Sequence, residues 1–210
     1  MKKLLIPMAL AAMIWSACSK ENVPDSGSDT PVFMVRFEDS ISGPGNVFTA
    51  GLGRTYLFTR VERGSDNVLV MSGAFADAGC PAGDCPGSLK FQFRNIGVEN
   101  FVNPIEIFGS DQSWEYKSPL SDSLALHTVS IQWVTQQGAI FRSEIIPQPQ
   151  DSSGSSLSHF RILNSQLWEI NERGEDTWKM EVDFSCLVFD SLQQEERKII
   201  GSGVIAVGYR

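Results

Sequence analysis

The chain has 210 residues, with 17 basic and 25 acidic side chains and a formal net charge of −8 at pH 7. An acidic chain repels nucleic acid and anionic membrane surfaces, so the charge argues against nucleic acid as a partner. Hydrophobic residues make up 42% of the sequence, which is enough to build a sizeable core.

The first 17 residues have the pattern of an export signal. Lys2 and Lys3 precede a mostly apolar run, 4–15, of about twelve residues. This is the length of a signal-peptide core and is too short to cross a bilayer as a helix. We therefore predict that residues 1–17 are a signal peptide.

The signal ends in the sequence WSAC at 15–18. Small residues before a cysteine resemble the lipobox of bacterial lipoproteins, although Trp15 stands where that family usually has Leu. The resemblance implies that residues 1–17 are removed and that Cys18 receives the lipid anchor, which would hold the mature chain on a membrane. The alternative is an ordinary secretory signal that leaves Cys18 as a free thiol.

Residues 18–30 follow this cysteine and are rich in Ser, Asp, Gly and Pro. Such a composition cannot bury an apolar core, so we predict a flexible, lipid-anchored tether. Because the signal carries Lys2 and Lys3, its removal makes the mature chain more acidic. We expect an exported protein anchored at the outer membrane, on its periplasmic side or at the cell surface.

From residue 31 onward, apolar residues recur at every second position, which is typical of half-buried β-strands. The clearest case is 178–189, where the alternation places Cys186 inward as a small apolar residue and not as a nucleophile. In chain order the predicted strands are 32–38, 55–62, 67–76, 88–94, 104–108, 113–117, 128–133, 139–146, 159–163, 166–171, 178–189 and 197–209.

Gly-bearing turns separate these strands, as at 42–46 and 136–138, and helical spacing is absent from the sequence after residue 31. The pattern predicts an all-β fold, an antiparallel β-sandwich that is immunoglobulin-like or partly closed and barrel-like, with almost no helix. We predict one sandwich domain over 31–210. The alternative is two sandwiches, 31–119 and 120–210.

The last strands, GEDTWKMEVDFSCLVFDSLQQEERKIIGSGVIAVGYR at 174–210, resemble the ends of small uncharacterised Bacteroidetes-type lipoproteins. Together with the signal and the lipobox, this resemblance implies a lipid-anchored β-sandwich of the cell envelope. It carries no catalytic residues to transfer to this chain.

Cys80 and Cys85 bracket the sequence PAGD in a loop dense in Gly and Pro, so we predict a disulfide between them. Two free thiols and a metal site are the competing interpretations. A structural zinc needs four ligands, and the only other candidates are Cys186, His127 and His159, none in a paired spacing. We predict neither a metal nor a cofactor.

No motif of a known catalytic site accompanies the two histidines, His127 and His159, which we interpret as solvated residues at strand starts. The sequence GSGVIA at 201–206 is followed by strand residues, so it is not a dinucleotide-binding turn. Its glycines instead suggest a bulge or hairpin in the last strand pair. The chain is therefore predicted to be non-catalytic.

Trp114 and Tyr116 fall on one face of the predicted strand 113–117. They could form an exposed platform that stacks on sugars, or they could pack into the core. We expect a binding or structural module of the envelope, with a glycan or an envelope protein as its partner. The alternative is a small secreted hydrolase of glycans or peptides.

Overall fold

The computed structural model describes residues 33–41, 43–50, 55–63, 68–80, 82–96, 104–118, 127–150 and 157–209. The predicted signal peptide, Cys18 and the tether 18–30 lie outside these residues. The elements in chain order are β1 (Met34–Asp39), β2 (Gly43–Thr49), β3 (Thr55–Arg63), β4 (Val68–Asp77), β5 (Ser88–Ile96), α1 (Pro104–Phe108), β6 (Gln112–Ser113), β7 (Glu115–Tyr116), β8 (Thr128–Val134), β9 (Ile140–Arg142), β10 (His159–Ile170), β11 (Asp176–Asp190) and β12 (Glu195–Gly208).

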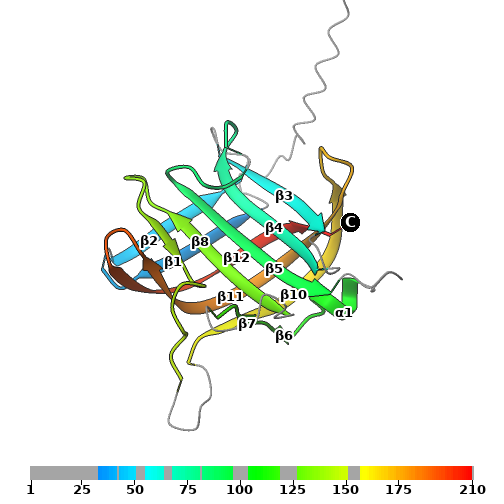
Figure 1. The fold of residues 1–210 in the computed structure, drawn as a ribbon. Coiled ribbons are helices and arrows are strands. Elements are labelled where there is room, and N and C mark those ends of the chain that lie inside the picture. Colours follow the sequence, from blue (N-terminus) through cyan, green and yellow to red (C-terminus); the bar gives the residue numbers. More distant parts are fainter. Residues whose placement is uncertain are drawn as a thin grey trace, which may run out of the picture.

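The strands form one curled sheet in the order β2-β1-β12-β11-β9-β8-β5-β4-β3, with β10 paired to β11 and β6, and β7 paired to β8. Among the described strands every pairing is antiparallel except that of β7 with β8. Figure 1 shows how the strands wrap around a common interior. The predicted all-β, antiparallel fold is therefore confirmed, as a sandwich or half-barrel.

The curl brings β3 and β4, at one end of the sheet order, against β12. The closest approach lies at Gly73 in β4, where a Cβ atom would stand 1.9 Å from the carbonyl oxygen of Ala206. A backbone oxygen cannot move aside as a flexible side chain can. Only glycine fits at this position.

The edge of β3 is closed by side chains from the turn between β10 and β11. The Glu175 carboxylate accepts a hydrogen bond from the N–H of Val61 at 3.3 Å, and the Asn171 amide donates to the carbonyl oxygen of Thr59 at 3.1 Å. Asn171 also donates to Glu175 at 2.8 Å, which holds the two side chains together. These two backbone groups at the edge of β3 are therefore hydrogen-bonded although no further strand pairs with them.

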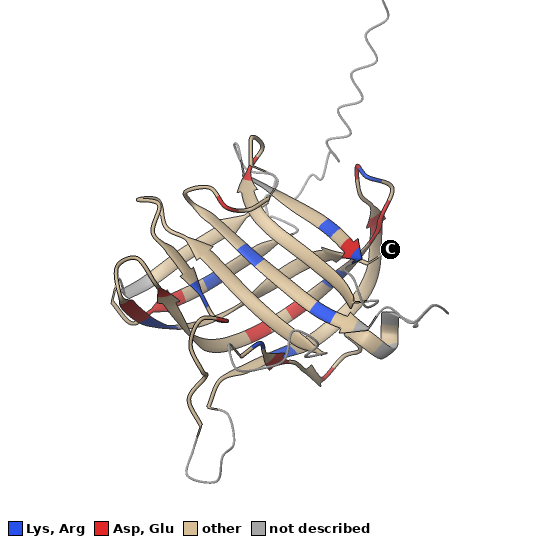
Figure 2. Cartoon of the chain, in the orientation of Figure 1, with Lys and Arg blue, Asp and Glu red and all other residues tan. Residues whose placement is uncertain are grey.

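The interior is filled by the inward faces of the strands, and aromatic rings dominate its centre. The alternation in β11 is confirmed, since Trp178, Met180, Val182, Phe184, Cys186 and Val188 are all buried. Burying one such side chain stabilises the fold by about 1.5–3 kcal/mol. The largest fully buried residues are Phe37, Phe75, Phe91, Phe93, Phe108, Phe141, Phe160 and Phe184, with Met71, Leu89, Ile107 and Ile131. Charged residues of both signs are spread over the strands and turns (Figure 2).

The predicted strand at 104–108 is wrong, because these residues form the short helix α1. Pro104 begins the helix, and a proline lacks the N–H that a sheet ladder needs but a first helical turn does not. Ile107 and Phe108 are buried, whereas Ile105 is 61% exposed. The apolar residues of this segment therefore reach the core from a helix.

Three other expectations need correction. The glycine-rich stretch that begins at 42 holds strand β2, and the two strands predicted over 159–171 are one strand, β10, with irregular register. The glycines of 201–206 mark no bulge, because the pairing of β12 with β11 and with β1 is unbroken there. Gly201 instead leaves room for Phe184 and for the backbone of Arg36.

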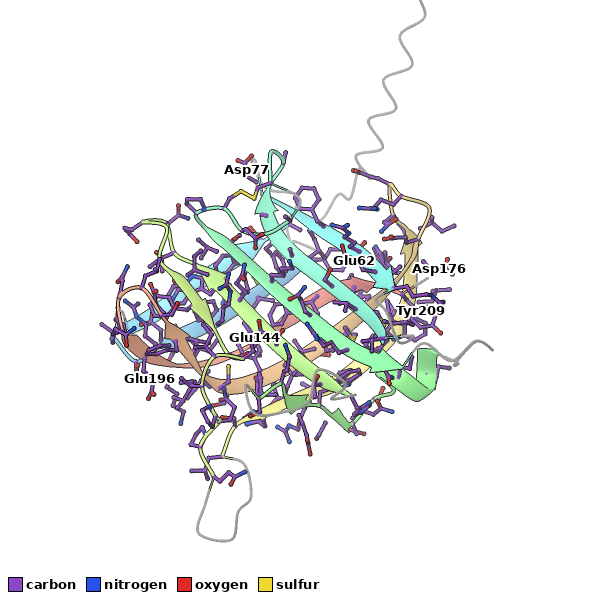
Figure 3. All side chains as sticks on the ribbon, viewed as in Figure 1. Glu62, Asp77, Glu144, Asp176, Glu196 and Tyr209 are labelled. Carbon is purple, nitrogen blue, oxygen red and sulfur yellow. A yellow bond between two sulfur atoms is a disulfide. The ribbon has the colours of Figure 1, made fainter. Side chains whose placement is uncertain are left out.

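Cys80 and Cys85 are joined by the predicted disulfide, with their Cα atoms 6.1 Å apart. The bond closes the loop between β4 and β5, next to Asp77 in Figure 3. The hydroxyl of Ser88 donates to the carbonyl oxygens of Gly83 and Cys85 at 2.8 and 2.7 Å, which ties the loop to the start of β5. Cys186 is the free cysteine of the described residues and is buried.

We predict that Gly73→Ala destabilises the fold by about 3 kcal/mol, the upper range for overpacking, because the new methyl group meets the Ala206 backbone. The midpoint of urea unfolding measures the effect. Gly79→Ala is the matched control, since a Cβ at Gly79 would have only an ordinary contact with Asp77 at 3.6 Å. Equal midpoints for the two variants would contradict the proposed close approach.

Candidate functional site

A hollow of about 490 Å³ lies between the β6–β7 segment, the loop that follows β9 and the start of β10. Figure 1 shows β6, β7 and β10 together at the lower side of the molecule. The lining combines three aromatic side chains with hydroxyl, amide, carboxylate and imidazole groups. It consists of Ser113, Trp114, Glu115, Tyr116, Ser118, Pro147, Gln148, Gln150, Ser158, His159 and Phe160.

Trp114 and Tyr116, the two aromatic residues predicted from the sequence, both line this hollow. The backbone N–H of Trp114 donates to the carbonyl oxygen of Phe160 at 2.9 Å, which attaches the segment to β10. Trp114 is only 2% exposed, so its ring packs in the core and forms no open platform. Tyr116 is half-buried and packs against the same core.

The indole ring of Trp114 lies in an aromatic cluster. It stacks on the imidazole of His127 with 4.1 Å between centroids and meets Phe93 edge-on at 5.0 Å. Its Nε1–H is buried and has no hydrogen-bond partner among the residues that the structure describes. An unsatisfied buried donor costs about 1–3 kcal/mol, so an acceptor that reached this group would bind favourably.

Gln148 holds the loop that forms the opposite wall. Its amide nitrogen donates to the carbonyl oxygens of Ser143 and Leu187 at 2.9 and 3.0 Å. Its amide oxygen accepts from the N–H of Leu187 and the hydroxyl of Ser158, both at 2.8 Å. The side chain therefore pairs with β11 much as a strand residue would, and it fixes the loop beside β10.

His159 lies at the rim of the hollow with its Nε2 atom 3.1 Å from Oδ2 of Asp183. Arg161 donates to the same carboxylate through two nitrogens, at 3.1 and 2.7 Å, and these hydrogen bonds and the charge of Asp183 raise the pKa of Arg161. Ser185 stands opposite His159 in the β10–β11 ladder. Within the described residues no hydrogen bond joins these two side chains.

Tyr116 connects the hollow to Cys186. Its hydroxyl donates to the carbonyl oxygen of His159 at 3.1 Å, and its side chain lies near that of Cys186. Burial raises the pKa of Tyr116 well above its ordinary value, and the nearby Cys186 adds to this. Burial also raises the pKa of the Cys186 thiol to about 12. The thiol therefore stays protonated at neutral pH, in agreement with its predicted role as an apolar residue.

His127 lies immediately before β8, has a positive φ of 59° and stacks, exposed, on Trp114. Burial of its ring lowers the pKa of His127, while the charge of Glu115 acts in the opposite direction. The sequence predicted both histidines at or near strand starts; His159 is the first residue of β10, and His127 is the residue before β8. It gave no signal that His127 would stack on Trp114, because the two come from different segments.

The described residues hold no group of three or more His, Cys, Asp or Glu side chains placed to bind a metal ion. No helix in this part of the chain is long and apolar enough to cross a membrane. Comparisons of the chain with protein-family models, with curated proteins and with solved structures give no match. A function must therefore be argued from the geometry of the site itself.

We predict that acidification through the ordinary titration range of histidine, about pH 8 to 5, destabilises the wild type more than His127→Asn. The folded chain keeps His127 neutral at a pH where the unfolded chain already binds a proton, so stability is lost as the pH falls. Asn tolerates the positive φ at this position. Urea unfolding across this range measures the difference, and parallel pH profiles would contradict the prediction.

Proposed function

We propose that the chain is a non-catalytic binding module of the bacterial cell envelope, with a glycan or another polyhydroxylated molecule as its ligand. The ligand would occupy the hollow beside Trp114 and Tyr116. The observation that carries the proposal is the buried, unpartnered indole N–H of Trp114, a residue that lines this hollow.

The other lining groups support the same ligand class. The half-buried ring of Tyr116 suits the apolar face of a sugar ring. The amide of Gln150, the carboxylate of Glu115 and hydroxyl groups such as that of Ser118 can donate to or accept from sugar hydroxyls. A volume of about 490 Å³ lies within the usual range for small-ligand sites.

The proposed location depends on the N-terminal sequence. The lipobox-like sequence WSAC at 15–18 supports lipid attachment at Cys18, and the composition of 18–30 supports a tether between the anchor and the β-sheet. The similarity of 174–210 to Bacteroidetes-type lipoproteins supports the outer membrane as the site of anchoring. A lipid-anchored module would display its hollow to ligands outside the cytosol.

A hydrolase is the second candidate. In its favour, His159 contacts Asp183, and Ser185 faces His159 across the ladder. These residue types form the triad of many hydrolases. However, Ser185 does not line the hollow, and Asp183 is also bound by Arg161. The three side chains are therefore not assembled as a triad that faces the hollow, and we favour the binding role.

We predict that a glycan array probed with the mature domain identifies at least one ligand, and that Trp114→Phe weakens its binding about tenfold. The substitution keeps an aromatic ring in the cluster but removes one hydrogen-bond donor, a loss of about 1–1.5 kcal/mol. Isothermal titration with the identified glycan gives the two affinities.

Trp178→Phe is the matched control for this experiment. Trp178 also has a buried indole N–H without a partner in the described part of the chain, but it does not line the hollow. Trp178→Phe should therefore leave the affinity for the glycan unchanged. Absence of any glycan ligand, or equal losses in both variants, would refute the proposal. Cleavage of the bound glycan would favour the hydrolase.

We predict that metabolic labelling with a palmitate analogue tags the wild-type chain and Cys186→Ala but leaves Cys18→Ala unlabelled. The lipid is expected only on the cysteine of the lipobox-like sequence. In-gel detection of the label provides the measurement. Equal labelling of all three proteins would show that the lipid is attached elsewhere.

A further inference from the structure

A second hollow, of about 590 Å³, lies along β2 and is independent of the first. One wall consists of consecutive β2 residues, Gly45 to Thr49. The rest comes from the end of β8, the turn after it, Gly87 and the start of β12. The lining residues outside β2 are Gly87, Trp133, Val134, Thr135, Gln136, Gln137, Ala139, Gln193 and Arg197.

Strand β2 ends the sheet order and pairs with β1 alone among the described strands. The N–H of Ala50 donates to the carbonyl oxygen of Phe33 at 3.1 Å, so these opposite residues form a hydrogen-bonded pair. Such pairs alternate with non-bonded pairs along an antiparallel ladder. Given the register, Phe48 and Asn46 also bond to β1.

The residues between them, Val47 and Thr49, must therefore direct their N–H and C=O groups away from β1. The described residues provide no other hydrogen-bond partner for either backbone. A hollow on one face of the sheet would be lined by alternate residues of β2, because successive side chains point to opposite faces. This hollow is lined by successive residues, so it runs along the open edge of the strand. Its wall thus offers backbone donors and acceptors at strand spacing.

The opposite wall carries uncharged amide side chains, at Gln136, Gln137 and Gln193, which can pair with a peptide backbone through both donor and acceptor atoms. The charge of Arg197 is already balanced, because its guanidinium lies 3.4 Å from Asp39 and 2.8 Å from Glu195. This wall therefore gives no preference for a phosphate or another anionic ligand.

We propose that this hollow binds an extended peptide segment of a partner protein, which adds as a strand to the open edge of β2. Main-chain hydrogen bonds to Val47 and Thr49 would provide the affinity, and the amide wall would close over the other side of the peptide. Residues 45–49 span about 13–17 Å as a strand, which accommodates roughly five peptide residues. The acidic chain favours an uncharged or basic segment.

The proline of β2, Pro44, and its register shift against β1 both lie before residue 46, so they do not protect the part of the edge that follows. Residues 46–49 are Asn, Val, Phe and Thr, without charge or proline, and the Val47 side chain is 50% exposed. Edges of this kind readily pair with another chain unless they are covered.

The test uses a phage-displayed library of random linear dodecapeptides, selected on the complete mature chain. Fluorescence anisotropy then measures the affinity of the most enriched peptide for Val47→Pro and Val47→Ala. Both variants remove the exposed side chain, but only proline removes the N–H. We expect Val47→Pro to bind at least about tenfold more weakly than Val47→Ala, in keeping with the loss of a backbone hydrogen bond.

A version of the peptide N-methylated at alternate residues gives a second measurement that requires no folded variant, and it should lose binding to the wild type. Failure to enrich any peptide, equal affinities of the two Val47 variants, or full binding of the N-methylated peptide would each overturn the proposal. Trp114→Phe should leave peptide binding unchanged, so the result is independent of the glycan site.

Discussion

The close packing of β4 against β12 at Gly73 is the constraint on which the arrangement of the sheet depends. Because Gly73 has no side chain, the backbone of Ala206 can approach it, and the sheet can curl until strands distant in its order meet. This curl encloses the aromatic interior. It also brings the β10–β11 turn to the edge of β3, where Asn171 and Glu175 satisfy the exposed backbone.

The edge strands at the two ends of the sheet order, β2 and β3, therefore differ in how their outward backbone groups are satisfied. At β3 the side chains of Asn171 and Glu175 bond to the backbone of Thr59 and Val61, which covers this part of the edge. At β2 the outward backbone groups of Val47 and Thr49 have no hydrogen-bond partner among the residues that the structure describes, and they lie beside an amide-lined hollow. The glycan and peptide proposals concern separate regions of the molecule and can succeed or fail separately.

The sequence predicted part of the candidate site. Trp114 and Tyr116 were selected because their spacing places them on one strand face, and both line the hollow. Their surroundings were not predictable, since Gln148 and His159 reach the hollow from segments far along the chain. The stacking of His127 on Trp114 likewise depends on which segments meet in the fold. The spacing of residues within one segment does not predict such a contact.

By itself the sequence determined the all-β class, most strands and the inward face of 178–188, because period-two alternation is a local property with a direct physical cause. It also determined the Cys80–Cys85 bond, since a short Gly- and Pro-rich loop brings the two residues together. Only the tertiary structure decided that 104–108 is helical and that β2 is an open edge. The helix at 104–108 and the open edge of β2 both depend on contacts between segments far apart in the sequence, and the curl of the sheet determines which segments meet.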